Sequence, residues 1–569
     1  MSIDAPFTPA KRKISVFWWI GAVALLLVIL FFVQLLGPSP KIVVSKQTTY
    51  VTEPLLPSGL PNYEEHLRQK LRDGITPENN AAVLLAQAQW SNELKDEQAE
   101  LVAAELGLKQ IPSTDTVMQP MYSEAMRQRV SAWLKPQYLR PDGAGIAPDA
   151  DDVIALTSSY PWTRQQLPAM AEWVDANQKP LDLIVEASGR PRYYWPVPEL
   201  LNDKPDSLAA ALPDIVTMRN SARGLTARAM RSIGENRLPE AWQDILAVYR
   251  LSDLMTQNSL LVGQLVGMAI RGMANHATQA LLSSPHLTET LAHQVREELA
   301  ALPAFSTMAD SMNFAERLFV LDSVIHAKTN GFNQIAGGLE DEIGTSPFDY
   351  AAVDWNIVLT KSNATFDDLV TAMRHPDAES RARALDDFET QLNAEQQHTR
   401  SPASWAAALF SRGARSELIG KLVVSLLLPA MQAANTADDR ARAVFAMTQL
   451  AAALAEYRAE HGKYPAQLDD LTPGILATVP ADMYHAKPYV YRRIDDGYLL
   501  YTAGSNGNDD GGSNEIQNIF EGQELEEMEL SDTDAEGAQI PAGADDFSIR
   551  MPKPDFKLPQ PTSQQSPIK

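Results

Sequence analysis

The 569-residue sequence contains no cysteine. Disulfides, thiolate metal sites, thiol nucleophiles and cysteine-ligated iron–sulfur clusters are therefore excluded. Basic residues are also scarce, with 48 Lys and Arg against 72 Asp and Glu, a net charge of -24 and an isoelectric point near 4.8. A nucleic-acid-binding function is disfavoured because it needs a basic surface. Half of the net charge lies between Ser505 and Arg550, which hold 13 acidic residues and one basic residue.

Familiar catalytic signatures are absent as well. The nine histidines include no pair at helical ligand spacing, and there is no His-Glu-x-x-His, Gly-x-Ser-x-Gly or Gly-x-Gly-x-x-Gly motif. Adjacent acids such as Asp151-Asp152 usually mark helix starts or solvated helix faces. The sequence identifies no catalytic residue and favours a non-enzymatic protein; a site assembled from distant residues would carry no such motif.

The amino terminus carries the longest apolar run. Ile14 to Leu36 are 23 uncharged, strongly apolar residues that follow Lys11, Arg12 and Lys13. This run is long enough to span a bilayer, and the basic cluster indicates a cytoplasmic amino terminus. The pattern predicts a cytoplasmic tail at 1–13 and an uncleaved signal anchor at 14–36, with the bilayer as a partner. The protein would then be a single-pass protein of a bacterial inner membrane, with the bulk of the chain in the periplasm.

The segments after this run differ in composition. Repeated prolines at 37–62 predict an extended stalk. The residues at 63–415 predict an irregular all-helical exported domain, with a helical hairpin between Leu225 and Met255 that turns at Ile233 to Arg237. Gly263 and Gly267, four residues apart, would let a neighbouring helix approach closely.

One loop of the helical region combines two cations with three aromatic rings between prolines, in Arg190-Pro191-Arg192-Tyr193-Tyr194-Trp195-Pro196-Val197-Pro198. Such a rigid loop can stack on sugars or on a partner peptide, which makes Arg190, Arg192, Tyr193, Tyr194 and Trp195 candidate partner-binding residues. The alternative is a loop whose rings cover the core.

The carboxyl-terminal part has a different pattern. Apolar residues at three- and four-residue spacings predict one long helix from 437 to 460, which ends before Gly462. Two β-rich runs, 489–493 and 498–502, flank Asp495-Asp496-Gly497, which supplies the positive-φ residue that a tight turn needs, and they predict a β-hairpin. Phe547 to Met551 alternate and predict a third strand, so a helix would pack on a small antiparallel sheet.

In this part the sequence resembles the type IV pilin and type II secretion pseudopilin family. The resemblance rests on Glu456-Tyr457-Arg458-Ala459-Glu460-His461-Gly462-Lys463-Tyr464-Pro465, Val479-Pro480-Ala481-Asp482, Lys487-Pro488-Tyr489-Val490-Tyr491, Asp496-Gly497-Tyr498-Leu499-Leu500-Tyr501 and the loop from Gly504 to Gly512. It covers about 416–551 and implies an α+β pseudopilin-like domain with an acidic insertion at 521–546, followed by a disordered tail at 552–569. The chain departs from the family because it lacks a prepilin peptidase site and because its pilin-like apolar stretch is internal.

The resemblance also implies a cofactor. In calcium-binding pseudopilins the carboxyl-terminal loop supplies oxygen ligands to one ion, and calcium takes six to eight oxygens. The candidate metal ligands here are Asn506, Asn508, Asp509, Asp510, Asn514 and Glu515. The alternative is a solvated acidic loop without an ion.

These observations predict a mainly α fold with a transmembrane helix, an all-helical domain and the pseudopilin-like domain. The expected function is contact with other envelope proteins, as a scaffold related to secretion or pili. The alternative is a membrane-anchored envelope hydrolase or carbohydrate-binding enzyme with a cleft beside Arg190 to Pro198.

Overall fold

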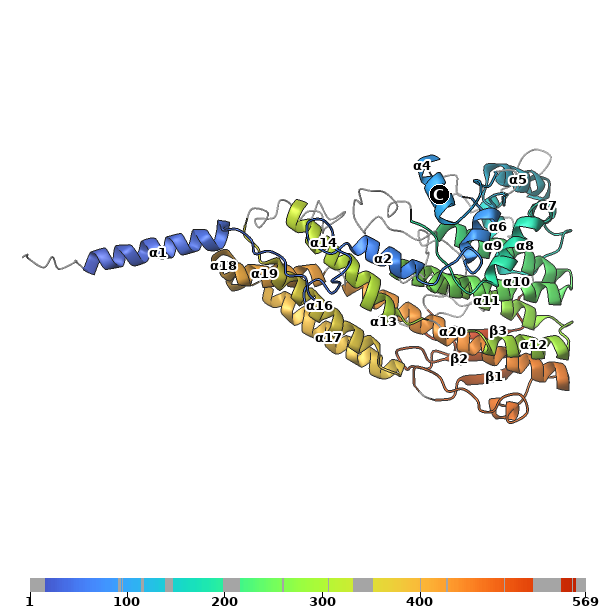
Figure 1. Ribbon diagram of the computed structural model, residues 1–569. Coiled ribbons are helices and arrows are strands. Elements are labelled where there is room, and N and C mark those ends of the chain that lie inside the picture. The colour runs from blue at the N-terminus through green and yellow to red at the C-terminus, as the bar shows by residue number, and fades with distance from the viewer. Residues whose placement is uncertain are drawn as a thin grey trace, which may run out of the picture. The chain divides into compact units, whose positions relative to one another are not determined.

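The computed structural model (Figure 1) describes residues 16–90, 94, 96–113, 117–138, 147–197, 215–257, 260–304, 306–330, 351–399, 401–425, 428–485, 487–514, 544–554 and 556–558. The chain forms two compact units. The first unit comprises 1–63, 318–368 and 388–428, and the second comprises 64–317, 369–387 and 429–569. The sequence predicts a linear division at 415, whereas both units are built from segments that are distant in sequence.

The described residues are mostly helical, with one small antiparallel sheet, and this part of the predicted fold class agrees with the structure. The strands are β1 (Val490–Ile494), β2 (Gly497–Thr502) and β3 (Phe547–Met551). The helices are α1 (Val16–Leu36), α2 (Tyr63–Arg72), α3 (Ala81–Ala88), α4 (Asp96–Glu105), α5 (Glu124–Tyr138), α6 (Ala150–Ser159), α7 (Pro168–Ala176), α8 (Gln178–Ser188), α9 (Ile215–Gly234), α10 (Leu238–Thr256), α11 (Leu261–Ser283), α12 (Glu289–Ala300), α13 (Met308–Ser311), α14 (Arg317–Asn330), α16 (Trp355–Met373), α17 (Ala378–Thr399), α18 (Pro402–Phe410), α19 (Arg412–Ser425) and α20 (Leu428–His461), with a π-helical turn at Met312–Glu316 and a 3-10 turn at Leu468–Leu471.

The predicted membrane anchor is wrong. None of the helices formed by the described residues combines the length and the apolarity that a membrane crossing needs. This finding overturns the signal anchor at 14–36, the single-pass topology and the inner-membrane location.

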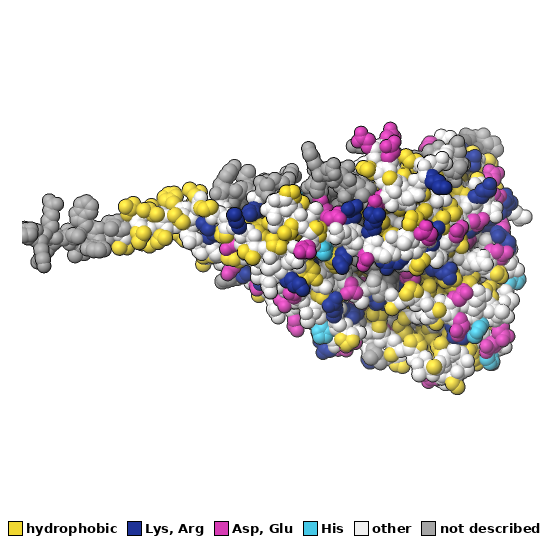
Figure 2. Space-filling view, in the orientation of Figure 1, with side chains coloured by type: hydrophobic (Ala, Val, Ile, Leu, Met, Phe, Trp, Pro, Cys, Tyr) yellow, Lys and Arg dark blue, Asp and Glu magenta, His cyan; other side chains and the backbone are white. Residues whose placement is uncertain are grey.

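The described part of α1 is nevertheless apolar and exposed, and Figure 2 shows hydrophobic side chains over it. The last turn of α1 is hydrogen-bonded to side chains of α19. The Arg412 side chain donates to the Val33 carbonyl at 2.9 Å, and Arg415 donates to the Gln34 carbonyl at 2.6 Å. Phe31 also lies against Phe410, with ring centroids 5.3 Å apart.

The predicted stalk packs onto α16. Asn363 donates to the Thr48 carbonyl at 2.6 Å, and Asn356 donates to the Lys41 carbonyl at 3.0 Å. The Thr49 side chain is fully buried. The asparagine side chains thus donate to backbone carbonyls that would accept from backbone N–H groups in a helix or a sheet.

In the second unit, α9 and α10 form the predicted helical hairpin. Asn236 adopts the positive φ of 58° at its turn, a conformation that asparagine tolerates better than most residues. The next helix, α11, packs closely on α10 through Gly267, where a Cβ would lie 2.5 Å from Thr256 Cγ2 and 3.1 Å from the Ser252 carbonyl oxygen. The close approach expected at this glycine is confirmed.

The three strands form a sheet in the order β1-β2-β3. The pairs Ile494↔Gly497 and Tyr498↔Met551 fix the two registers. The inward side chains of β2 and β3 join those of α20 and of the helices before it in one continuous core. The helical segments of the second unit and the carboxyl-terminal sheet therefore fold around a shared core.

The positive φ in the turn between β1 and β2 falls on the first of the three residues predicted to supply it. Asp495 takes the positive φ, 45°, and Gly497 is not among the residues with positive φ. Glycine is required at 497 for another reason, because a Cβ there would lie 2.8 Å from the Met551 carbonyl carbon and 3.0 Å from Pro552 Cδ. The residue allows the backbone of β3 to approach.

Candidate metal centre

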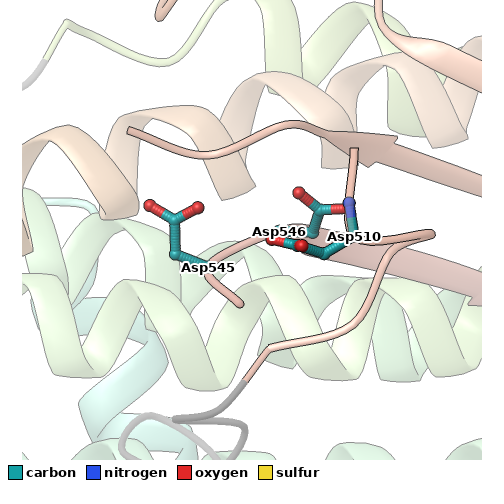
Figure 3. A group of neighbouring side chains, drawn as sticks. All are labelled: Asp510, Asp545 and Asp546. Carbon is teal, nitrogen blue, oxygen red and sulfur yellow. The ribbon is translucent and has the colours of Figure 1, made fainter. Parts of the chain in front are cut away.

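Three aspartates meet where the loop after β2 returns to the residues that precede β3. Asp510 lies in that loop, and Asp545 and Asp546 stand directly before Phe547, the first residue of β3. Each aspartate offers one carboxylate oxygen, and these oxygens all lie within 4.8 Å of one another. Figure 3 shows the Asp546 and Asp510 carboxylates side by side.

Asp546 is the buried member of the group. Its exposed fraction is 0%. Oδ2 accepts hydrogen bonds from the backbone N–H groups of Asp510, at 2.9 Å, and Gly512, at 2.8 Å. Oδ1 is shielded from solvent and has no hydrogen-bond partner among the described residues. A buried polar atom without a partner is costly, and a cation bound by Oδ1 would provide that partner.

Asp545 is held by the loop that follows β2. Its Oδ2 accepts from the Ser505 N–H at 2.8 Å, the Ser505 hydroxyl at 2.7 Å and the Asn506 N–H at 3.1 Å. Its Oδ1 is likewise shielded and unpaired among the described residues. Gly504, at φ +59°, makes this approach possible, because a Cβ there would lie 2.5 Å from Asp545 Cγ.

The charge balance of the group is unfavourable without a cation. Burial raises the pKa of Asp546 to about 6, although the Gly512 and Asp510 N–H groups oppose the shift, and the neighbouring Asp510 carboxylate adds to it. The negative charge of Asp510 thus disfavours ionisation of Asp546. A divalent cation would turn this repulsion into coordination.

The donor set indicates the kind of cation. Carboxylate oxygens suit hard cations such as Ca²⁺, Mg²⁺ and Mn²⁺, whereas softer metals prefer nitrogen or sulfur ligands. Three carboxylates fall short of the six to eight oxygens that calcium takes, so loop carbonyls, amides or water would complete the shell. Asn506 lies beside the cluster, because its Nδ2 donates to an Asp510 carboxylate oxygen at 3.4 Å.

The ligands suggested by the sequence are only partly those of the cluster. Asp510 belongs to it, and Asn514 donates to the Asp546 carbonyl at 3.0 Å. Asn508 donates its N–H to Asn506 Oδ1 at 2.6 Å, and Glu515 lies outside the described residues. Asp509 accepts instead from the Tyr501 hydroxyl at 2.8 Å, which turns it toward β2.

The sequence did not single out Asp545 and Asp546, because they lie at the end of the acidic insertion predicted at 521–546. One signal could have found them. Two adjacent acids directly before a strand that pairs with β2 must lie beside the residues that follow β2, because the start of one antiparallel strand lies beside the end of its neighbour.

The aromatic loop proposed for partner binding is held by the protein itself. Tyr193, Tyr194 and Trp195 are 5%, 6% and 8% exposed. Arg190 donates to the Asn80 carbonyl at 2.8 Å, and Arg192 donates to the Asp73 carbonyl at 2.8 Å. The rings cover the core, and both arginine side chains donate hydrogen bonds to backbone carbonyls.

Comparison with protein-family models, with curated proteins and with solved structures found no match for this chain. The resemblance to pseudopilins therefore rests on the quoted residues alone.

Proposed function

We propose that the carboxyl-terminal part of this protein binds a divalent cation between Asp510, Asp545 and Asp546, and that the protein works through protein contacts that this ion stabilises. Calcium is the first candidate. The oxygen-only donor set supports a hard cation, and the pseudopilin resemblance is the reason to place calcium before magnesium.

One observation carries the proposal. Asp546 is fully buried, yet its Oδ1 has no hydrogen-bond partner among the described residues while two further carboxylates lie within 4.8 Å. Acidic clusters on surfaces are common and are stabilised by water. A buried carboxylate is stable only when it is protonated, paired or bound to a metal. Among the described residues, Asp546 Oδ2 accepts from two backbone N–H groups and Oδ1 has no partner.

The partners proposed are components of a secretion or pilus assembly. This rests on the resemblance of 416–551 to pseudopilins, whose known role is assembly with related subunits. The enzyme alternative has no specific support among the described residues, because the loop at 190–195 buries its rings instead of lining an open cleft.

The experiment uses the full-length protein after removal of metals with a chelating resin. Terbium luminescence excited through nearby tyrosines and calorimetric titration with CaCl₂ measure binding, with MgCl₂ as comparison. At a calcium concentration of 100 times Kd the folded state gains about 2.7 kcal/mol, so the melting temperature must rise with calcium.

Two variants complete this test. Asp546→Asn should abolish the calcium-dependent rise in melting temperature, whereas Asp496→Asn, the same charge change at an exposed turn of the same sheet, should retain it. Equal melting temperatures of the unmodified protein in calcium and in EDTA, together with no terbium emission, would refute the proposed site.

A further inference from the structure

The cluster joins two parts of the chain that are far apart in sequence. Asp510 and Asp546 are separated by 36 positions, and the chain between them leaves at Asn514 and returns at Ala544. Backbone contacts already bring the two ends together, through an antiparallel bridge between Asn514 and Asp545 and a 3.1 Å hydrogen bond from the Asp546 N–H to the Ser513 carbonyl. An ion bound to both sides would cross-link them and close a long loop.

The far side of this cross-link is the start of β3. Asp546 is followed at once by Phe547, which pairs with Thr502 of β2. The inward side chains of β3, Ile549 and Met551, are 1% and 3% exposed. The position of the aspartates thus determines where β3 enters the sheet and the core.

The other end of β3 is attached to α11. The hydroxyl of Ser283, the last residue of α11, donates to Met551 Sδ at 3.0 Å and accepts from the Lys553 N–H at 3.0 Å. β3 is therefore an edge strand held at both ends, at one end by the aspartate cluster and at the other by a helix.

We infer that the ion acts as a clasp for β3: cation binding at Asp510, Asp545 and Asp546 sets the fraction of molecules in which β3 is seated on β2 and α11. This inference rests on the proposed cation site. With the cation bound, the start of the strand is fixed beside the loop after β2. Without it, repulsion among three carboxylates acts at that same point and favours release of the strand. Release would free the outer edge of β2, which other extended chains can use for pairing.

The coupling has a reciprocal consequence. If ion binding favours the state in which β3 is paired with β2, then weakening the contact between the end of β3 and α11 must weaken ion binding. Ser283 lies on α11 and is not a member of the cluster, so it probes the coupling without removing a ligand.

The first test is hydrogen exchange of the full-length protein in calcium and in EDTA, with terbium binding measured on the same sample. We expect the amide exchange of Phe547 to Met551 to rise at least about tenfold in EDTA, a coupling of ordinary size. Amides of β1 that bond to β2 and amides of the α9–α10 hairpin serve as internal references for global unfolding, and the rise in exchange of β3 must exceed any rise in theirs.

The second test is calcium affinity of Ser283→Ala, with Ser159→Ala on α6 as control. We expect Ser283→Ala to raise the Kd for calcium about fivefold, at the lower end of measured couplings, and the control to leave it unchanged. Ion binding without any change in β3 exchange, or equal Kd values for the two variants, would overturn the clasp and leave the cation site intact. Absence of ion binding would overturn both.

Discussion

The close approach at Gly497 yields a sharp prediction. Replacing Gly497 by alanine places a Cβ 2.8 Å from the Met551 carbonyl carbon and 3.0 Å from Pro552 Cδ, and the Met551 carbonyl oxygen lies closer still. All of these atoms belong to backbone or to a proline ring, so none can rotate away. Because ordinary contacts of a Cβ begin near 3.4 Å, the end of β3 must move outward by more than half an ångström.

The size of the effect follows from what this displacement removes. Met551 is 3% exposed, and burial of a methionine side chain stabilises a fold by about 1.5–3 kcal/mol. The Tyr498↔Met551 pair closes this end of the β2–β3 ladder, and each hydrogen bond lost there costs about 1 kcal/mol. We expect Gly497→Ala to reduce the free energy of unfolding by about 3 kcal/mol.

The measurement is urea unfolding followed by far-ultraviolet circular dichroism, with Gly474→Ala as the control. Gly474 is not among the glycines with positive φ, and no heavy atom lies within 4 Å of the position that a Cβ would take there. Its replacement should therefore change stability by less than about 0.5 kcal/mol. Equal stability of the two variants would refute the argument that the position of β3 requires a residue without a Cβ at 497.

Three further predictions concern the helical part of the second unit. Gly234→Ala would place a Cβ 2.6 Å and 2.8 Å from the backbone C and N of Trp162, and it should lower stability by about 1–3 kcal/mol in the same urea assay. Trp195→Ala should cost about 3–5 kcal/mol because its buried ring leaves a cavity, and unaltered stability together with lost binding of a partner would contradict the structural role. Burial acts to raise the pKa of Glu235, but hydrogen bonds from Arg237 and Arg231 outweigh it and hold that pKa below its ordinary 4.5. The ionised Glu235 therefore adds to the free energy of unfolding above pH 4.5, and this contribution disappears as the pH falls through the lower pKa of the folded state. In acid, the free energy of unfolding should thus fall more steeply for the unmodified protein than for Glu235→Gln.

The sequence alone was sufficient where the signals are local. The α9–α10 hairpin and its turn, the two strands around Asp495-Asp496 and the third strand at 547–551 all appear where periodicity and turn residues predicted them. These features depend on residues a few positions apart, so composition and spacing specify them without knowledge of the rest of the fold. The absence of cysteine likewise excludes whole classes of chemistry on composition alone.

Tertiary structure decided what depends on residues distant in sequence. It brought Asp545 and Asp546 to Asp510, across 36 positions, and showed that Gly497 is needed for the passage of β3 and not for the turn. It buried the rings at 193–195, for which the sequence left open both a binding loop and a cover for the core. Burial and proximity are set by the packing of whole segments against one another, and a linear pattern carries no record of which distant segment becomes a neighbour.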